Sequence, residues 1–308
     1  MSPRWIDSQV PGGSEVFLDH VGYFVADLDA AGVQLERLGF KVSLANVQTN
    51  ADASGALKPS GTSNRLARLK RGFLEILAAT HDTPLADQFK AALARYRGLH
   101  LIALSHDDIP GTRARLVGDG FAMQDVVELR RRDRSMADNP EVHFSVLRPQ
   151  PGVMAEGRVQ WVKPHTLDSV WRPETITTDN GAEGLTDMLL VVDDPAAVAV
   201  RYGRYTGVSP VARGGLHAVP LDRGGLVFAS AADAARILPG FRATSLPFMA
   251  GQALRADLAL TRIALANAGI RPVFESDDVV CVGPGDALGG YMLFHAPGVD
   301  EPWSAMAS

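Results

Sequence analysis

A histidine in an apolar stretch is the first residue in this sequence that could do chemistry. The segment L-D-H-V-G-Y-F-V-A-D, residues 18–27, is typical of a buried strand, yet it carries His20. An imidazole in such a place is either a core residue with satisfied hydrogen bonds, or a metal ligand or proton-transfer group. His100 lies seven residues before Asp107, just as His20 lies seven residues before Asp27. The repeated spacing indicates matching places in the fold.

The residues after His20 predict a helix followed by three strands. The stretch 28–40 has one apolar helical face, formed by Leu28, Ala31, Leu35 and Leu38. A glycine, Gly39, ends the predicted helix. Strand-like alternation follows in K-V-S-L-A-N-V-Q, S-N-R-L-A-R-L-K and G-F-L-E-I-L-A. Together with the strand around His20, these elements make a β-α-β-β-β unit.

The same order of elements returns three times along the chain. The second copy begins at 99–108 and ends at 158–162, the third runs from 184 to 229, and a degraded fourth runs from 247 to 294. An extra helix is predicted at 84–98 and a linker at 172–181. We therefore expect an α+β fold of four βαβββ units, arranged as one pair over 16–171 and a second pair over 183–297.

Three motifs of the first unit resemble a known family. D-H-V-G-Y-F-V-A-D-L-D-A-A, G-T-S-N-R-L-A-R-L and R-G-F-L-E-I-L-A are similar to the glyoxalase-like domain group of the vicinal oxygen chelate superfamily, which includes glyoxalase I, extradiol dioxygenases and bleomycin resistance proteins. The resemblance is close in unit one, moderate in unit two, and limited to layout in the last two. It implies that each pair of units forms a cup-shaped half-barrel, with ligands projecting from the first and last strand of each unit.

The resemblance also implies a metal site in the first cup. Its ligands, found by matching the units to each other, would be His20, Glu75, His100 and Gln160. Two imidazoles, a carboxylate and an amide oxygen suit one divalent ion, either Fe, Mn, Zn, Ni or Co. The second pair offers no usable set, because its matching residues are Thr186 or Asp187, Phe228, Ala250 and Leu293.

The register of His100 has an alternative. Counting back from the G-D-G-F segment at 118–121, instead of from Asp107, puts Leu101 at the site and turns His100 to the other face of its strand. We expect His20 itself to point into the cup beside Gly22, with Asp19 on the opposite face. A His100 on the far side of its strand would favour a metal-free protein.

Two polar residues complete the candidate site. Asn64, in G-T-S-N-R, could orient a substrate oxygen or cap a turn. His165, in V-K-P-H-T-L-D-S-V-W, could carry protons or make a structural hydrogen bond, and His143 is interpreted as structural.

Three functions are compatible with this set. The first is a divalent-metal-dependent isomerase or lyase that chelates neighbouring oxygens of a small substrate, with Glu75 or His165 as the base because Gln160 cannot take a proton. The second is an extradiol-type dioxygenase, in which His20, His100 and Glu75 hold iron(II). The third is a metal-free protein that sequesters a ligand, as bleomycin resistance proteins do.

Composition narrows the partners to a small molecule. The chain has 308 residues and a net charge of −5, and its basic run R-R-R-D-R at 130–134 lacks interleaved aromatics, which predicts a solvated loop and no nucleic-acid partner. No apolar run approaches the roughly 18–20 residues needed to cross a bilayer. The single Cys281 and the absence of a signal-like start favour a cytoplasmic location. A homodimer is left open.

Overall fold

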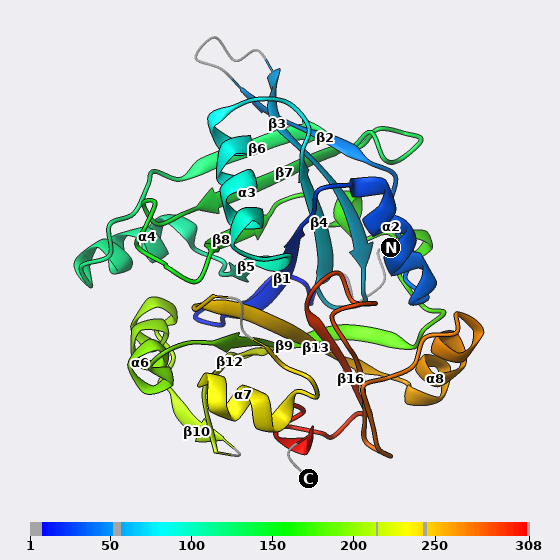
Figure 1. Ribbon diagram of the computed structural model, residues 1–308. Helices are drawn as coiled ribbons and strands as arrows, with labels where there is room; N and C mark the ends of the chain where they lie inside the picture. Colours follow the sequence, from blue (N-terminus) through cyan, green and yellow to red (C-terminus); the bar gives the residue numbers. More distant parts are fainter. Residues whose placement is uncertain (1–7, 52–56, 214, 243–244, 307–308) are drawn as a thin grey trace.

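One continuous sixteen-stranded sheet runs through the protein in a computed structural model, which describes residues 8–51, 57–213, 215–242 and 245–306. The sheet follows the order β10-β11-β12-β9-β13-β5-β1-β4-β3-β2, with β8-β7-β6 branching from β5 and β16-β15-β14 branching from β13. Figure 1 shows the strands of the first half above those of the second half. The predicted α+β class is confirmed.

The first half of the chain contains two sets of one strand, one helix and three strands. The first set is β1 (Phe17–Phe24), α2 (Leu28–Arg37), β2 (Asn46–Ala51), β3 (Leu57–Arg68) and β4 (Phe73–Ala79). After α3 (Pro84–Arg95), the second set is β5 (Gly98–Ser105), α4 (Ile109–Gly118), β6 (Val127–Arg132), β7 (Glu141–Leu147) and β8 (Arg158–Pro164). Two short helices, α5 (Leu167–Val170) and η1 (Pro173–Thr175), lead to the second half.

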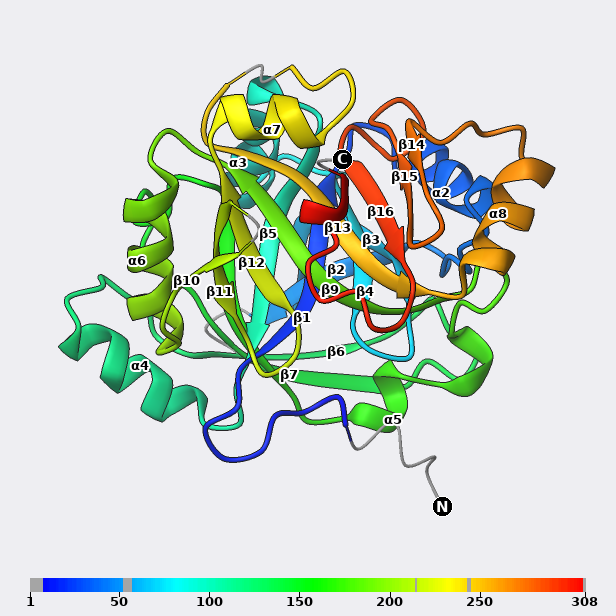
Figure 2. The same cartoon turned by 90° about the horizontal axis from the view of Figure 1, so that it is seen from below.

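The second half repeats this order, with a longer first strand and shorter later strands in each repeat. Its elements are β9 (Ala182–Val191), α6 (Pro195–Thr206), β10 (Val211–Arg213), β11 (Leu216–Pro220), β12 (Gly225–Ala229), α7 (Ala231–Ile237), β13 (Phe248–Ala256), α8 (Leu258–Asn267), β14 (Phe274–Glu275), β15 (Val279–Val282), β16 (Tyr291–His295) and η2 (Ser304–Met306). Figure 2 shows α4 and α6 on one side of the sheet and α2 and α8 on the other. None of the helices in the described residues is both long and apolar enough to cross a bilayer.

An aspartate starts the helix of each repeat. Asp27, Asp108, Asp194 and Asp257 are the N-caps of α2, α4, α6 and α8, and each side chain accepts a hydrogen bond from a backbone N–H of the first turn. The cap therefore marks the same position in every repeat. Seven residues before these caps, the first repeat has His20 and the second has Leu101.

The first half forms a cup around the β1–β5 pair. β1 and β5 run antiparallel, and β4 and β8 flank them in parallel, so that β4-β3-β2 and β8-β7-β6 form two arms (Figure 1). Gly22 lies opposite Leu101 at the bottom, where a Cβ on Gly22 would come within 2.9 Å of Leu101 Cβ. Glycine is needed there because the two strands approach closely.

Candidate functional site

The cup encloses a cavity of about 310 Å³. Most of its wall is apolar and comes from both arms and from α3, including Leu66, Leu77, Phe89, Leu129 and Phe144. Polar side chains gather within the same cavity, among them His20, Asn64, Glu75 and Gln160. Apolar walls together with convergent polar groups are typical of a small-molecule site, and this cavity is richer than usual in polar groups.

His20 is held in a fixed orientation by its two neighbours. Its ring stacks on Phe73, with the ring centroids 4.2 Å apart, and its Nδ1 is 2.6 Å from Asp19 Oδ1. The expectation that Asp19 faces away from His20 is wrong. The β1–β5 register shifts between Leu18 and His20, and such a bulge re-aims side chains, so that adjacent residues can meet.

Glu75 lies across from the free side of the His20 ring. The distance from His20 Nε2 to Glu75 Oε2 is 3.7 Å. Asn64 Nδ2 donates to Glu75 Oε1 at 2.6 Å, and Gln48 Nε2 lies 3.5 Å from the same oxygen. The amide of Asn64 therefore fixes the carboxylate and leaves its second oxygen facing the imidazole.

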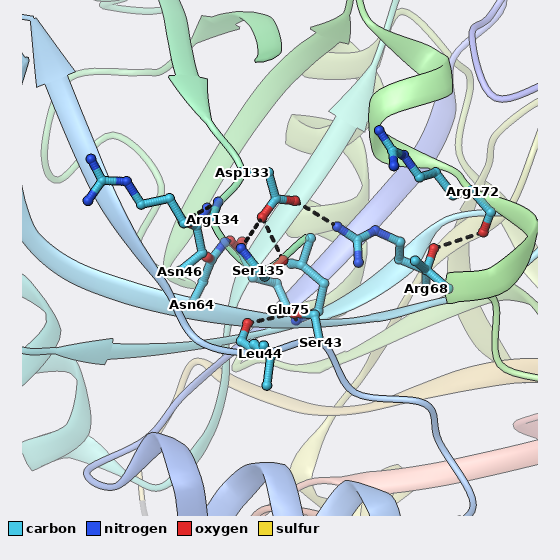
Figure 3. A network of polar contacts seen from close by, with 12 residues as sticks. Ser43, Leu44, Asn46, Asn64, Arg68, Glu75, Asp133, Arg134, Ser135 and Arg172 are labelled. Carbon is cyan, nitrogen blue, oxygen red and sulfur yellow. Dashed lines mark hydrogen bonds and ion pairs between the residues drawn. The ribbon is translucent and has the colours of Figure 1, made fainter. Parts of the chain in front are cut away.

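A buried ion pair ties the chain after β6 to β3. Arg68 Nη2 lies 3.1 Å from Asp133 Oδ2, and both N–H and O–H of Ser135 donate to Asp133 Oδ1 (Figure 3). Burial lowers the pKa of Arg68, and Asp133 opposes that effect. The run 130–134 is therefore not the solvated loop that its composition predicts, because β6 continues to Arg132 and Asp133 is buried.

Three more arginines face the cavity from the second arm. Arg131 is on β6, Arg148 follows β7, and Arg158 begins β8, where it pairs in register with Leu101. Burial lowers the pKa of all three, to about 9 for Arg148, and the negative charge of Glu75 acts against this shift in each case.

The cavity carries an excess of positive charge. Its lining contains four arginines against two carboxylates, namely Arg68, Arg131, Arg148 and Arg158 against Glu75 and Asp133. Because Arg68 is neutralised by Asp133, the three remaining guanidinium groups share the charge of Glu75. None of these three forms an ion pair with a carboxylate in the described part of the chain.

His100 does not line this cavity, so its predicted role as a ligand is wrong. Its Nε2 lies 2.9 Å from Tyr96 O, and its ring stacks on Tyr96 and Phe24. The side chain borders a separate cavity of about 240 Å³ instead, while Leu101 faces the cup. The count from Asp107 failed because Asp108 is the residue that caps α4.

His165 also lies outside the cup, so it cannot act there as a base. Gln160 and Val162 of β8 face the cavity, and alternation along the strand turns His165 to the outer face. There it meets two residues that the sequence did not link to it. Glu128, His143 and His165 have ligand atoms within 4.8 Å of one another.

Part of a metal shell is present in the cup. The 3.7 Å between His20 Nε2 and Glu75 Oε2 is a separation that two ligands of one ion can have. Asp19 holds the imidazole in the way that an outer carboxylate holds a ligating histidine.

The other half of that shell does not assemble. Gln160 Oε1 accepts a hydrogen bond from Arg148 Nε at 3.0 Å. Leu101 faces the cavity in place of the predicted fourth ligand, His100. The guanidinium group of Arg148 places a positive charge beside Gln160, and this charge disfavours the binding of a metal cation there. The predicted set of His20, Glu75, His100 and Gln160 therefore does not fit one divalent ion.

Comparison with known proteins gives one family and several structures of the same fold. A family model described as a glyoxalase-like domain matches residues 18–206, more than half of the chain. No curated protein matches the sequence. A hypothetical protein from Staphylococcus aureus has a TM-score of 0.64 at 9% identity, covering 91% of this chain and 99% of the other.

Two enzymes share the fold at similarly low identity. A catechol 2,3-dioxygenase has a TM-score of 0.53 at 14% identity, covering 92% of this chain and 88% of the other. A Mn(II)-bound glyoxalase from Novosphingobium aromaticivorans has a TM-score of 0.53 at 11% identity, covering 92% and 82%. At identities this low, the similarity shows only that these proteins share a fold with this chain.

Proposed function

Because this chain belongs to the glyoxalase-like domain family of the vicinal oxygen chelate superfamily, we propose that its cup binds a small organic anion and that His20 moves a proton at a carbon atom of this anion. One observation carries the proposal. The Asp19–His20 pair opens into the same cavity as three guanidinium groups that lack a carboxylate partner.

The arginines indicate the charge of the substrate. Taking a charge out of water is costly unless an opposite charge compensates it, and Arg131, Arg148 and Arg158 share Glu75, while Asp133, which acts on Arg131 as well, is already paired with Arg68. A carboxylate or phosphate supplies the missing charge, and guanidinium groups bind such anions through paired hydrogen bonds. The apolar wall suits an aliphatic or aromatic body attached to the anionic group.

The pair formed by Asp19 and His20 supports proton transfer. With its Nδ1–H donated to Asp19, the neutral ring presents a lone pair on Nε2 to the cavity. A proton on the carbon beside a substrate carbonyl passes to Nε2, and the electron pair of the C–H bond remains as an enolate, whose oxygen the guanidinium groups stabilise. Glu75, at 3.7 Å from Nε2, can receive or return the proton. This is the chemistry of an isomerase or a lyase.

The other two hypotheses differ in their support. The dioxygenase hypothesis placed His20, His100 and Glu75 around one iron, and His100 borders a different cavity. The sequestering hypothesis is the second candidate, because the incomplete ligand shell and the arginines suit an anion-binding protein without turnover.

Exchange of carbon-bound protons in D₂O tests the proposal. We would incubate 2-oxo acids of graded apolar size with the wild type and follow the proton beside the carbonyl by NMR. We expect His20→Gln to slow the exchange by about 10²–10⁴-fold, the usual contribution of a positioned base. His81→Gln, at an exposed histidine, should leave it unchanged.

Binding is measured separately by thermal shift. Arg148→Met should abolish the stabilisation by these anions, while His20→Gln should keep it. Binding without exchange in the wild type would identify a sequestering protein. Binding that is equally strong in Arg148→Met would refute the anion site.

A further inference from the structure

We propose that Glu128, His143 and His165 form a second site, which binds one divalent transition-metal ion such as Zn²⁺ on the outer face of the β6-β7-β8 arm. We call it the outer-face site. It shares no residue with the lining of the cavity, so it is independent of the proposed function.

The strands themselves bring the three side chains together. Val127 and Leu129 on β6, and Val142 and Phe144 on β7, face the cavity, so Glu128 and His143 between them face outward. The backbone N–H of His165 donates to His143 O at 2.9 Å, which fixes the two histidines next to each other. The positions thus come from paired strands, which define a site more rigidly than loops do.

The ligand nitrogens of the two histidines already lie close to one carboxylate oxygen of Glu128. Glu128 Oε2 lies 2.6 Å from His143 Nε2 and 3.9 Å from His165 Nε2, and the two rings stack with centroids 4.2 Å apart. Around a tetrahedral Zn²⁺ with bonds of about 2.0–2.2 Å, ligand atoms are roughly 3.3 Å apart. Shifts of about 1 Å or less per side chain, which rotation about side-chain bonds can provide, would give this geometry.

Ser145 positions the carboxylate in the manner of an outer-shell residue. Its hydroxyl donates to Glu128 Oε1 at 2.7 Å and leaves Oε2 toward the histidines. The same hydroxyl oxygen is 2.7 Å from His165 Nε2, a contact that the ion would replace. Outer-shell hydrogen bonds of this kind orient ligands and raise metal affinity.

The surroundings set the type of site and its strength. Side-chain exposure is 14% for His143, 31% for His165 and 51% for Glu128, so water can reach an ion and complete its coordination. Lys163 and Arg130 act on His165 as nearby positive charges, although Lys163 is paired with Asp107 at 2.7 Å. Two imidazoles and one carboxylate suit Zn²⁺, Ni²⁺, Co²⁺ or Cu²⁺ better than Mg²⁺ or Ca²⁺.

Metal titration of the untagged full chain tests the site. After removal of metal with a chelator, Zn²⁺ binding is measured by equilibrium dialysis with elemental analysis, and Co²⁺ binding by its visible absorption. We expect one Zn²⁺ per chain in the wild type. Glu128→Gln and His165→Asn should each weaken Zn²⁺ binding by more than about tenfold. Loss of a residue that only supports a ligand already lowers metal affinity by about tenfold or more, so loss of a ligand itself should lower it further.

Two controls separate this site from the cup and from misfolding. A His20→Gln/Glu75→Gln double variant should keep the Zn²⁺, and His81→Asn should behave as the wild type. Zn²⁺ should raise the melting temperature of the wild type but not of His165→Asn, whose fold is checked by circular dichroism. Loss of Zn²⁺ in the cup double variant, or equal affinity in the wild type and both outer-face variants, would overturn the proposal.

Discussion

Acid should destabilise this protein through His100, which is buried behind the cavity wall. The ring lies between Tyr96 and Phe24, its Nε2–H donates to Tyr96 O at 2.9 Å, and its Nδ1 has no partner in the described residues. A protonated ring would leave the second N–H buried without an acceptor. Burial accordingly lowers the pKa of His100 from 6.5 to about 4.

The size and sign of the effect follow from this shift. Between pH 6.5 and pH 4 the unfolded chain binds a proton at residue 100 and the native chain does not, so stability rises with pH in this window. At about 1.4 kcal/mol per pKa unit, the shift corresponds to about 3 kcal/mol. This stability is present above pH 6.5 and is lost as the pH falls to about 4.

Urea unfolding at a series of pH values measures the effect. We would compare the wild type with His100→Phe, which retains an aromatic ring for stacking, and with His81→Phe, in which the histidine is exposed. On going from about pH 7 to pH 4, the wild type and His81→Phe should lose about 3 kcal/mol more of unfolding free energy than His100→Phe. Parallel pH profiles for all three proteins would refute the assignment of His100 as a buried neutral residue.

Two further predictions concern the support of the cup. Gly72→Ala should lower stability by about 1–3 kcal/mol in thermal unfolding, because residue 72 has a φ of +74° and a Cβ there would lie 2.6 Å from Asp19 O. Arg68→Met should cost about 3–5 kcal/mol in urea unfolding, because it leaves Asp133 buried without its partner, and a second change of Asp133→Leu should recover part of this loss. A larger loss in the double variant than in Arg68→Met would contradict the ion-pair explanation.

Local patterns in the sequence predict much of the fold. The alternation around His20, the helical face after it and the Leu-Glu-Ile stretch around Glu75 correspond to β1, α2 and β4. The apolar runs of the two strands are nearly continuous because both faces of these strands are buried. The class of the fold could therefore be predicted from these patterns, while the position of His20 beside Glu75 came from the resemblance to the glyoxalase-like domain group.

The second arm was harder to predict, because a shift of one residue turns a side chain to the other face. Two adjacent aspartates precede α4, so the counts from Asp107 and from the G-D-G-F segment disagreed, and the capping residue, Asp108, shows that the second count, which matches Leu101 to His20, is correct. Arg131 was assigned to a loop because its neighbours are charged, although it continues the inward positions of Val127 and Leu129. Glu128 and His143 come together because β6 pairs with β7. The spacing of residues within one segment of the sequence does not reveal this contact.

The second half of the chain contributes to the cup through its charge. The turn before β12 packs on β1, since Leu18 N–H donates to Arg223 O at 2.8 Å. At Gly224 a Cβ would come within 2.8 Å of Leu18 Cβ, so glycine permits this contact. Burial lowers the pKa of Arg223 to about 10, and the negative charge of Asp19 acts in the opposite direction.

The second half of the chain lacks the predicted metal ligands, but it affects the site in the first half through Asp19. Asp19 is fully buried, and its Oδ2 has no hydrogen-bond partner among the described residues. Taking a carboxylate out of water is costly unless an opposite charge compensates it, and Arg223 of the second half acts on Asp19 as such a charge. Asp19 Oδ1 in turn lies 2.6 Å from His20 Nδ1, and this contact leaves Nε2 toward the cavity. The carboxylate that orients the proposed base in the first half is therefore stabilised by the positive charge of an arginine from the second half.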